Sequence, residues 1–441
     1  MLNKKTGKQL LAVVLALALC AASVFAAEPS EQEGAAGQAE ADQILVSNET
    51  DQPEDGQEDQ DVEESGDGEE EYVPDPAGTV SYENLERRMR ENNLSLLALE
   101  ESIQAIEAID YDEMADDYRD GLNDIAKMQW GMRTNPMLGG MGSIMSSSLD
   151  AQYDALREAF DAIKDGDLQQ DNADLIRQLE NTQNQLVVAG EALYIALAGL
   201  EINQRTLDRT LDATDRSIQE VELRYQLGQV SALTQEQAQA GRTALLSSQQ
   251  TLRMNQENLS IQLKQMIGAD LTSELELTAL PEVTGEELEA MNLEEDLEAA
   301  KTASYSLYDA KLTLDDAKET FDDAPKNQRS YEYQVALHQW QSAQHTYNAA
   351  VQSFETNFRI LFNQVKDCKQ LLDAARTALA VEESNYAVDQ LKYEQGTISY
   401  NELLTAQDDL AAAQDEVDTA AINLFSTYNT YRWAVDYGIL N

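Results

Sequence analysis

The chain has 441 residues, of which 82 are acidic and 30 are basic, giving a formal net charge of −52. Such a surface repels phosphate groups, so the composition argues against nucleic acid and against an anionic membrane surface as partners. The sequence contains no phosphate-binding loop, nucleophile elbow or zinc-protease helix. We therefore predict no catalytic activity, no cofactor and no bound metal.

The N-terminus is typical of a secretory signal peptide. Three lysines precede an apolar run from Leu10 to about Ala22, and small residues follow it, so residues 1–26 are predicted to be cleaved off. A retained anchor is an alternative, although a run of roughly 13 residues is shorter than the roughly 20 that a span needs. Lipid attachment at Cys20 is another. After cleavage Cys368 is the remaining thiol, so no intramolecular disulfide is expected.

Residues 27–80 are predicted to form an acidic, disordered linker. From Glu28 to Asp75 there are 19 acidic residues and no Lys or Arg, interleaved with Gly, Pro, Gln and Ser. A segment of this composition cannot bury enough apolar surface to offset the entropy lost on ordering, and its like charges repel one another.

The remainder is predicted to be all-α. Apolar residues recur at spacings of three and four from Leu193 to Tyr225 and again from Phe358 to Tyr393, which is typical of coiled-coil seams. We predict two tandem helical repeats, at residues 81–270 and 289–441, joined by a linker at 271–288. Each repeat would contain a long antiparallel hairpin, with entering helices continuous from about Leu149 to Tyr225 and from about Arg329 to Tyr393, and no globular core.

A short sequence occurs twice, as RYQLGQVSALTQEQAQA from residue 224 and KYEQGTISYNELLTAQD from residue 392. The two copies are in register at an offset of 168 residues, which indicates an internal duplication. Each copy is predicted to be the turn of a hairpin. Gly228 and Gly396 suit the left-handed backbone that ends a helix, and Ser231 and Ser399 can cap the next helix.

This order of elements resembles the TolC-type outer-membrane efflux factor family. Members commonly carry a Glu-Asn-Asn pattern in the first helix, here Glu91, Asn92 and Asn93, and a Tyr-x-x-Gly-x-x-Ser turn followed by an Ala-Gln pair. The resemblance covers about residues 80 to 436. It implies that three chains close a helical tube through which substrates pass passively, at the outer membrane or in the periplasm, or outside the cytoplasmic membrane if the cell has no outer one.

The resemblance further implies that the turns dock a periplasmic-adaptor-type (membrane fusion) protein that joins the tube to an inner-membrane pump. The residues expected to do so are Tyr225, Leu227, Gly228, Val230, Ser231, Tyr393, Gln395, Gly396, Ile398 and Ser399. Some members narrow the entrance with acidic residues six and nine positions after the second glycine. Glu402 matches the first position, and Thr405 departs from the second.

The chain departs from the family between the short and long helices. Members that span an outer membrane insert a β-hairpin there in each half, whereas NPMLGGMGSIMSSS does not alternate in polarity. We therefore expect a TolC-like tube with little or no β-barrel, and leave membrane insertion open. The first half is about 43 residues longer than the second at this end, and the extra sequence is predicted to be helical.

Other features have simpler explanations. His338 and His345 lie seven residues apart and could share a metal, but solvated side chains are expected; Cys368 is expected to be a small buried seam residue. The cluster of Met132, Met137, Met141 and Met145 is most simply adaptable packing, with soft-metal binding or contact with lipid as alternatives. The alternative to a conduit is a non-transport coiled-coil spacer or scaffold of the cell envelope.

Overall fold

The computed structural model describes residues 74–76, 78–134, 137 and 139–440. Contacts divide the chain into Met1–Pro74 and Asp75–Asn441, and every described helix and strand belongs to the second unit. The predicted signal peptide, Cys20 and most of the predicted acidic linker lie outside the described residues.

The first repeat contains one short strand and six helices in the described residues. In chain order they are β1 (Thr79–Val80), α2 (Leu85–Asn92), α3 (Leu94–Glu107), α4 (Tyr111–Thr134), α5 (Gly139–Asp165), α6 (Asp167–Gln226) and α7 (Ala232–Met266). A second strand, β2 (Glu276–Leu277), follows and pairs with β1 in parallel. Thr79 and Val80, which the sequence analysis assigned to the linker, thus contact the segment that joins the repeats.

The second repeat is shorter and helical throughout its described elements. These are α8 (Gly285–Ala290), α9 (Leu293–Ala303), α10 (Tyr305–Asp323), α11 (Tyr331–Glu394) and α12 (Tyr400–Tyr437). The prediction of an all-α fold with two long hairpins is confirmed, since β1 and β2, of two residues each, are the strands that the described residues contain.

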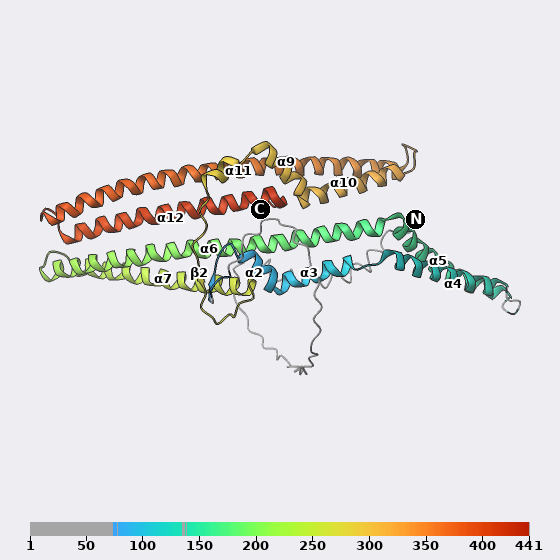
Figure 1. Ribbon diagram of the computed structural model, residues 1–441, viewed down its shortest axis with the longest axis horizontal. Helices are drawn as coiled ribbons and strands as arrows, with labels where there is room; N and C mark the ends of the chain where they lie inside the picture. Colours follow the sequence, from blue (N-terminus) through green and yellow to red (C-terminus); the bar gives the residue numbers. More distant parts are fainter. Residues whose placement is uncertain (1–73, 77, 135–136, 138, 441) are drawn as a thin grey trace, which may run out of the picture. The chain divides into compact units, whose positions relative to one another are not determined.

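Two long helices dominate the unit. The 60 residues of α6 and the 64 of α11 correspond to about 90–100 Å at 1.5 Å per residue. In Figure 1, α6 and α7 form one antiparallel hairpin, α11 and α12 form the other, and both turns lie at the same end. The predicted bounds of α11 are confirmed. The helix predicted from Leu149 is wrong at its start, because Gly166 has a φ of +88° and separates α5 from α6.

The extra sequence of the first repeat forms the hairpin of α4 and α5, which confirms its predicted helical character. It lies between α3 and α6, whereas the described residues of the second repeat contain no helix between α10 and α11. Figure 1 shows the free end of this hairpin opposite the two long-hairpin turns.

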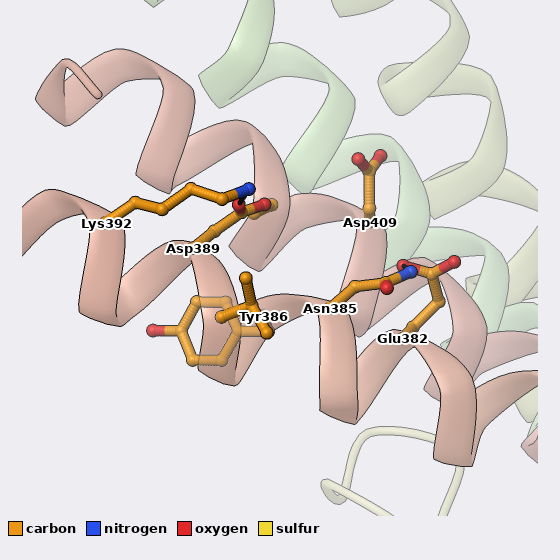
Figure 2. Close-up of a pocket in the computed structure, with 8 residues that line it drawn as sticks. Glu382, Asn385, Tyr386, Asp389, Lys392 and Asp409 are labelled. Atoms are coloured by element: carbon orange, nitrogen blue, oxygen red, sulfur yellow. Dashed lines mark hydrogen bonds and ion pairs between the residues drawn. The ribbon is translucent and has the colours of Figure 1, made fainter. Parts of the chain in front are cut away.

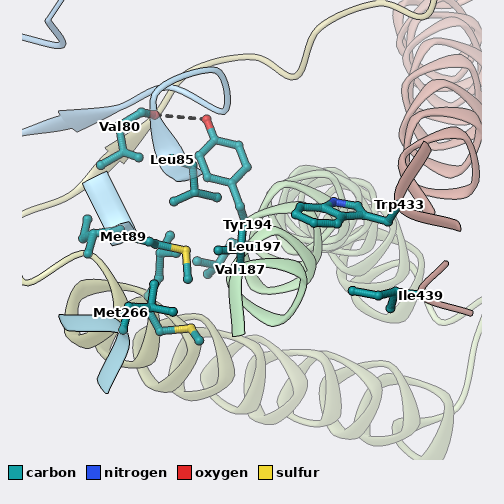
Figure 3. Close-up of a cluster of buried hydrophobic side chains, with 12 residues drawn as sticks. Val80, Leu85, Met89, Val187, Tyr194, Leu197, Met266, Trp433 and Ile439 are labelled. Atoms are coloured by element: carbon teal, nitrogen blue, oxygen red, sulfur yellow. Dashed lines mark hydrogen bonds between the residues drawn. The ribbon is translucent and has the colours of Figure 1, made fainter. Parts of the chain in front are cut away.

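Two hydrophobic cores occur in the described residues, where the sequence analysis predicted no globular core. In the first core, shown in Figure 3, side chains of α2, α6 and α7 meet Trp433 and Ile439 from the C-terminal end of the chain. The Tyr194 hydroxyl lies 3.0 Å from the carbonyl oxygen of Val80 in β1 and 2.7 Å from that of Thr278, which directly follows β2, so it joins this pair of segments to α6. The second core gathers Phe354, Phe358, Leu361, Phe362, Val365, Leu424 and Tyr431 around α9, α11 and α12.

Helix α6 also contains a stretch that is apolar and long enough to cross a membrane. Its side chains Val187, Tyr194 and Leu197 are buried in the first core. A core helix is therefore sufficient to explain this composition.

The two repeats end in the same way. A positive-φ glycine follows α7 at Gly268 and α12 at Gly438, with φ of +64° and +63°. Gly268 packs against Asn92 at the break between α2 and α3, and Gly438 packs against Ser304 at the break between α9 and α10. The duplication seen at the turns therefore extends to the opposite end of each hairpin.

Candidate functional site

The first turn, between α6 and α7, has the backbone that its sequence predicts. Gly228 has a φ of +70°, and the Gln229 N–H reaches back to the Arg224 carbonyl oxygen at 2.8 Å. This bond satisfies a carbonyl group at the end of α6. The Ser231 side chain then accepts a hydrogen bond from the Thr234 N–H at 3.3 Å and caps α7.

The second turn, between α11 and α12, repeats this pattern. Gly396 has a φ of +69°, and the Thr397 N–H donates to the Lys392 carbonyl oxygen at 2.9 Å. Both partners lie 168 residues after their counterparts in the first turn. Ser399 caps α12 through the Glu402 N–H at 3.3 Å. The two turns are thus duplicates in backbone geometry as well as in sequence.

The turns present apolar side chains to solvent. Leu227 is 64% exposed and Tyr225 is 43% exposed, while Tyr393 lies with its ring centroid 5.8 Å from that of the exposed Tyr400. Gln395 is exposed as well, whereas Val230 and Ile398 are half-buried inside their turns. The structure therefore places the predicted docking residues in two groups, one on each turn, with most of their side chains accessible.

Glu402 has a structural partner at the second turn. Its carboxylate accepts a hydrogen bond from the Ser399 backbone N–H at 2.7 Å and completes a capping box. This bond, with that to the Ser399 side chain, lowers the pKa of Glu402 below its ordinary value. The carboxylate stays ionised at neutral pH and so contributes a fixed negative charge at the turn.

A groove runs between α11 and α12 just behind the second turn (Figure 2). It has a volume of about 260 Å³ and is lined by Glu382, Asn385, Tyr386, Val388, Asp389, Lys392, Ala406 and Asp409. Lys392 is paired with Asp389 at 2.5 Å. The two remaining carboxylates give the groove a net negative charge, which suits a basic side chain of a partner.

A row of ion pairs joins the first hairpin to the second along α6 and α12. Arg209 binds the buried Asp415 at 2.6 Å, and the Thr206 hydroxyl donates to the same carboxylate at 2.9 Å. Arg205 pairs with Asp418 at 2.7 Å, and Arg216 pairs with Asp408 nearer the turns. These contacts fix the spacing of the two hairpins within one chain.

Further from the turns, a buried carboxylate joins the repeats. Glu191 of α6 accepts hydrogen bonds from the Trp433 indole N–H at 2.6 Å and the Asn429 amide at 2.7 Å, both on α12. Burial raises the pKa of Glu191, and the two hydrogen bonds oppose that shift. The ring of Tyr82 packs beside this junction, 4.7 Å from that of Phe425.

The other candidates from the sequence have ordinary surroundings. Cys368 is half-buried against the second core, with its sulfur 3.6 Å from the Thr427 hydroxyl. No group of three or more His, Cys, Asp or Glu side chains suited to a metal ion occurs in the part of the chain that the structure describes.

Sequence reasoning missed the groove, the α6–α12 ion pairs and the Glu191 junction. Their residues are scattered along separate helices and lie among 82 acidic residues of which most are solvated. The role of Gly438 could have been predicted from the sequence, because Gly438 follows Gly268 by nearly the same number of residues that separates the two turns.

Comparison with known proteins gives fold likeness only. No protein-family model and no curated protein matches the chain. Among solved structures it is similar to the outer membrane protein VceC from Vibrio cholerae, at 13% identity and a TM-score of 0.46, over 81% of this chain and 96% of that one. It is also similar to CusC, which forms a transmembrane channel, at 15% identity and a TM-score of 0.48 over the same shares. The CmeC outer membrane channel of Campylobacter jejuni is 13% identical over 65% of this chain and 68% of that one, with a TM-score of 0.43.

The chain's own helices confirm the helical fold of two repeats that the TolC-type resemblance implies. With identities of 13–15% and TM-scores below 0.5, its function has to be inferred from its own residues.

Proposed function

We propose that three copies of this chain close a TolC-like helical conduit in the cell envelope and dock an adaptor protein through the six turns that the trimer would carry. Transport through the conduit is passive, and an inner-membrane pump supplies the energy. The observation that carries this proposal is the duplicated turn. Two hairpins that end in the same backbone hydrogen bonds, at the same end of the unit, suit a ring of equivalent contact points.

The surface of the long hairpins supports assembly into a larger wall. Apolar side chains remain exposed along the helices of one chain: Leu223, Met254, Ile261, Ile360, Leu371, Val381, Val388 and Leu391. Soluble monomers rarely leave so many apolar residues uncovered along adjoining elements, and contact with neighbouring copies would bury them. A tube built this way would also have an anionic lumen, since the chain has 82 acidic and 30 basic residues.

The turns and the groove together define where an adaptor would bind. Exposed Leu227 and Tyr393 provide apolar contact at the tips, and the acidic groove behind the second turn accepts a basic side chain. Glu402 contributes negative charge to the same entrance, and its place in the capping box holds that charge at a fixed position. An adaptor that presents apolar and basic side chains at its contact surface is the partner that these features fit.

Replacing Gly228 or Gly396 with proline is expected to weaken adaptor binding at least tenfold, or about 1.4 kcal/mol. Proline holds φ near −65°, so it cannot adopt the φ of +70° or +69° that these turns require. The measurement is the affinity of the purified chain for an adaptor protein from the same cell, by calorimetry or pull-down, with helicity checked by circular dichroism.

Gly166→Pro is the matched control. Gly166 also has a positive φ, has open space around it and links two helices, but it lies between α5 and α6, away from the turns. The control variant should keep the parental affinity. Unchanged binding by both turn variants, or an equal loss in the control, would count against docking at the turns and favour the scaffold alternative.

A further inference from the structure

The free end of the α4–α5 hairpin is apolar on its outside. Met128 and Trp130 at the end of α4 are 50% and 72% exposed, and Met137, Met141 and Ile144 are 95%, 66% and 71% exposed. Five large apolar side chains therefore face solvent within one hairpin end. Adaptable packing against the rest of the chain, the simplest reading of the methionines from sequence, does not account for them.

The same end lacks the charge that covers the rest of the protein. In a chain with a formal charge of −52, residues 128–149 contain one charged side chain, Arg133, and no carboxylate. Polar contacts begin at the base of this segment, where Asp150 accepts from Gln129 at 2.9 Å and pairs with Arg133 at 3.1 Å. Trp130 therefore lies beside this polar boundary, and Met137, Met141 and Ile144 lie beyond it, towards the free end of the hairpin.

The arrangement of the exposed side chains indicates what surrounds them. Met128 and Trp130 are separated by about 200° around α4, so they face nearly opposite directions. A protein partner that covers one face would leave the other in water. A lipid phase encloses an inserted end from all sides. Trp and Met side chains are both compatible with the interface between lipid and water.

We propose that the apolar end of the α4–α5 hairpin, with Trp130 at the polar boundary and Met137, Met141 and Ile144 beyond it, binds membranes by entering one lipid leaflet. From Gly139 to Leu149, α5 rises about 16 Å, which is close to half of the roughly 30 Å hydrocarbon core. The end is therefore long enough to enter one leaflet and too short to cross both. The charge of the chain disfavours anionic lipids, so the expected surface is zwitterionic. This inference does not depend on adaptor docking, which involves the opposite end of the unit.

The test uses Trp130 as its own probe. The full chain is mixed with phosphatidylcholine vesicles whose acyl chains are brominated, because bromine quenches tryptophan emission only at contact distance. We expect the parental chain to lose part of its emission relative to unbrominated vesicles, and Trp130→Phe to lose none. The remaining tryptophans, Trp340 and Trp433, lie on α11 and α12.

A charge-matched pair of variants shows whether the end itself is responsible. Combining Met137→Glu, Met141→Glu and Ile144→Glu should weaken the quenching of Trp130 at least about tenfold, because each carboxylate opposes entry into lipid. The control combines Leu94→Glu, Leu97→Glu and Leu271→Glu, which are also exposed apolar positions but lie outside the long hairpins, and it should keep the parental quenching.

Two results would overturn the proposal. One is the absence of quenching that depends on Trp130. The other is a result from sedimentation, in which the three-Glu variant of the hairpin end has a lower assembly mass than the parental chain while the control variant keeps the parental mass. The second result would make the apolar end an interface between copies of this chain.

Discussion

Replacing Gly438 with alanine is expected to destabilise the protein by about 3 kcal/mol, whereas the same change at Gly396 should cost about 1 kcal/mol. Both glycines have a left-handed backbone, with φ of +63° and +69°. The difference lies in the space around them. A Cβ on Gly438 would overlap the Cα and N atoms of Ser304, while nothing lies within 4 Å of a Cβ on Gly396.

The overlap at Gly438 cannot be relieved cheaply. Ser304 is buried, its N–H donates to Ala300 at the end of α9, and its side chain caps α10. Moving its backbone would disturb both helices. The measurement is the free energy of unfolding in urea, followed by circular dichroism, for both variants and for Gly228→Ala as a second open-turn control. Equal losses at Gly438 and Gly396 would contradict the close contact between α12 and the α9–α10 break.

Removing the Glu191 side chain is expected to cost about 3–5 kcal/mol, the largest effect that we predict, because it leaves buried donors unpaired and opens a cavity. In Glu191→Ala the Trp433 indole N–H and the Asn429 amide lose their shared acceptor, and a cavity forms between α6 and α12. Glu191→Gln should cost far less, about 1 kcal/mol, because its carbonyl oxygen can accept from the same donors. The free energies of unfolding of the two variants in urea test whether Glu191→Ala loses more stability than Glu191→Gln.

The pH dependence separates the charge of Glu191 from its hydrogen bonds. Its folded pKa is raised above the ordinary value of 4.5, so the folded state holds the proton more tightly than the unfolded state does. Stability from this group is greatest below pH 4.5 and is lost as the pH rises through the raised folded pKa. Relative to the parental protein, Glu191→Gln should therefore gain stability as the pH rises. A difference that does not change with pH would contradict a raised pKa.

The hairpins were predictable from sequence because their signals are local. The seam before Tyr393 is a periodic run of apolar residues, and Gly396 and Ser399 mark where one helix ends and the next begins. The structure gives α11 and α12 close to these bounds. The break at Gly166 was missed because a single glycine in a long helical pattern does not by itself indicate an end.

The buried groups could not be predicted in the same way. Glu191 lies on a helix with many other polar residues, and its burial depends on Trp433 and Asn429 more than 230 positions later in the chain. The contact of Gly438 with Ser304 likewise joins distant segments. No local sequence pattern identifies the partners of such groups, so these contacts can be recognised only from the packing of the helices in the structure.

The mass of the protein in solution is the most direct test of the conduit. Sedimentation equilibrium of residues 75–441, in buffer without detergent, measures it independently of shape. We predict a trimer, because the apolar side chains left exposed along the long hairpins need neighbouring copies to cover them. A stable monomer or dimer at micromolar concentration would contradict the closed tube and leave the two hairpins as parts of an envelope scaffold.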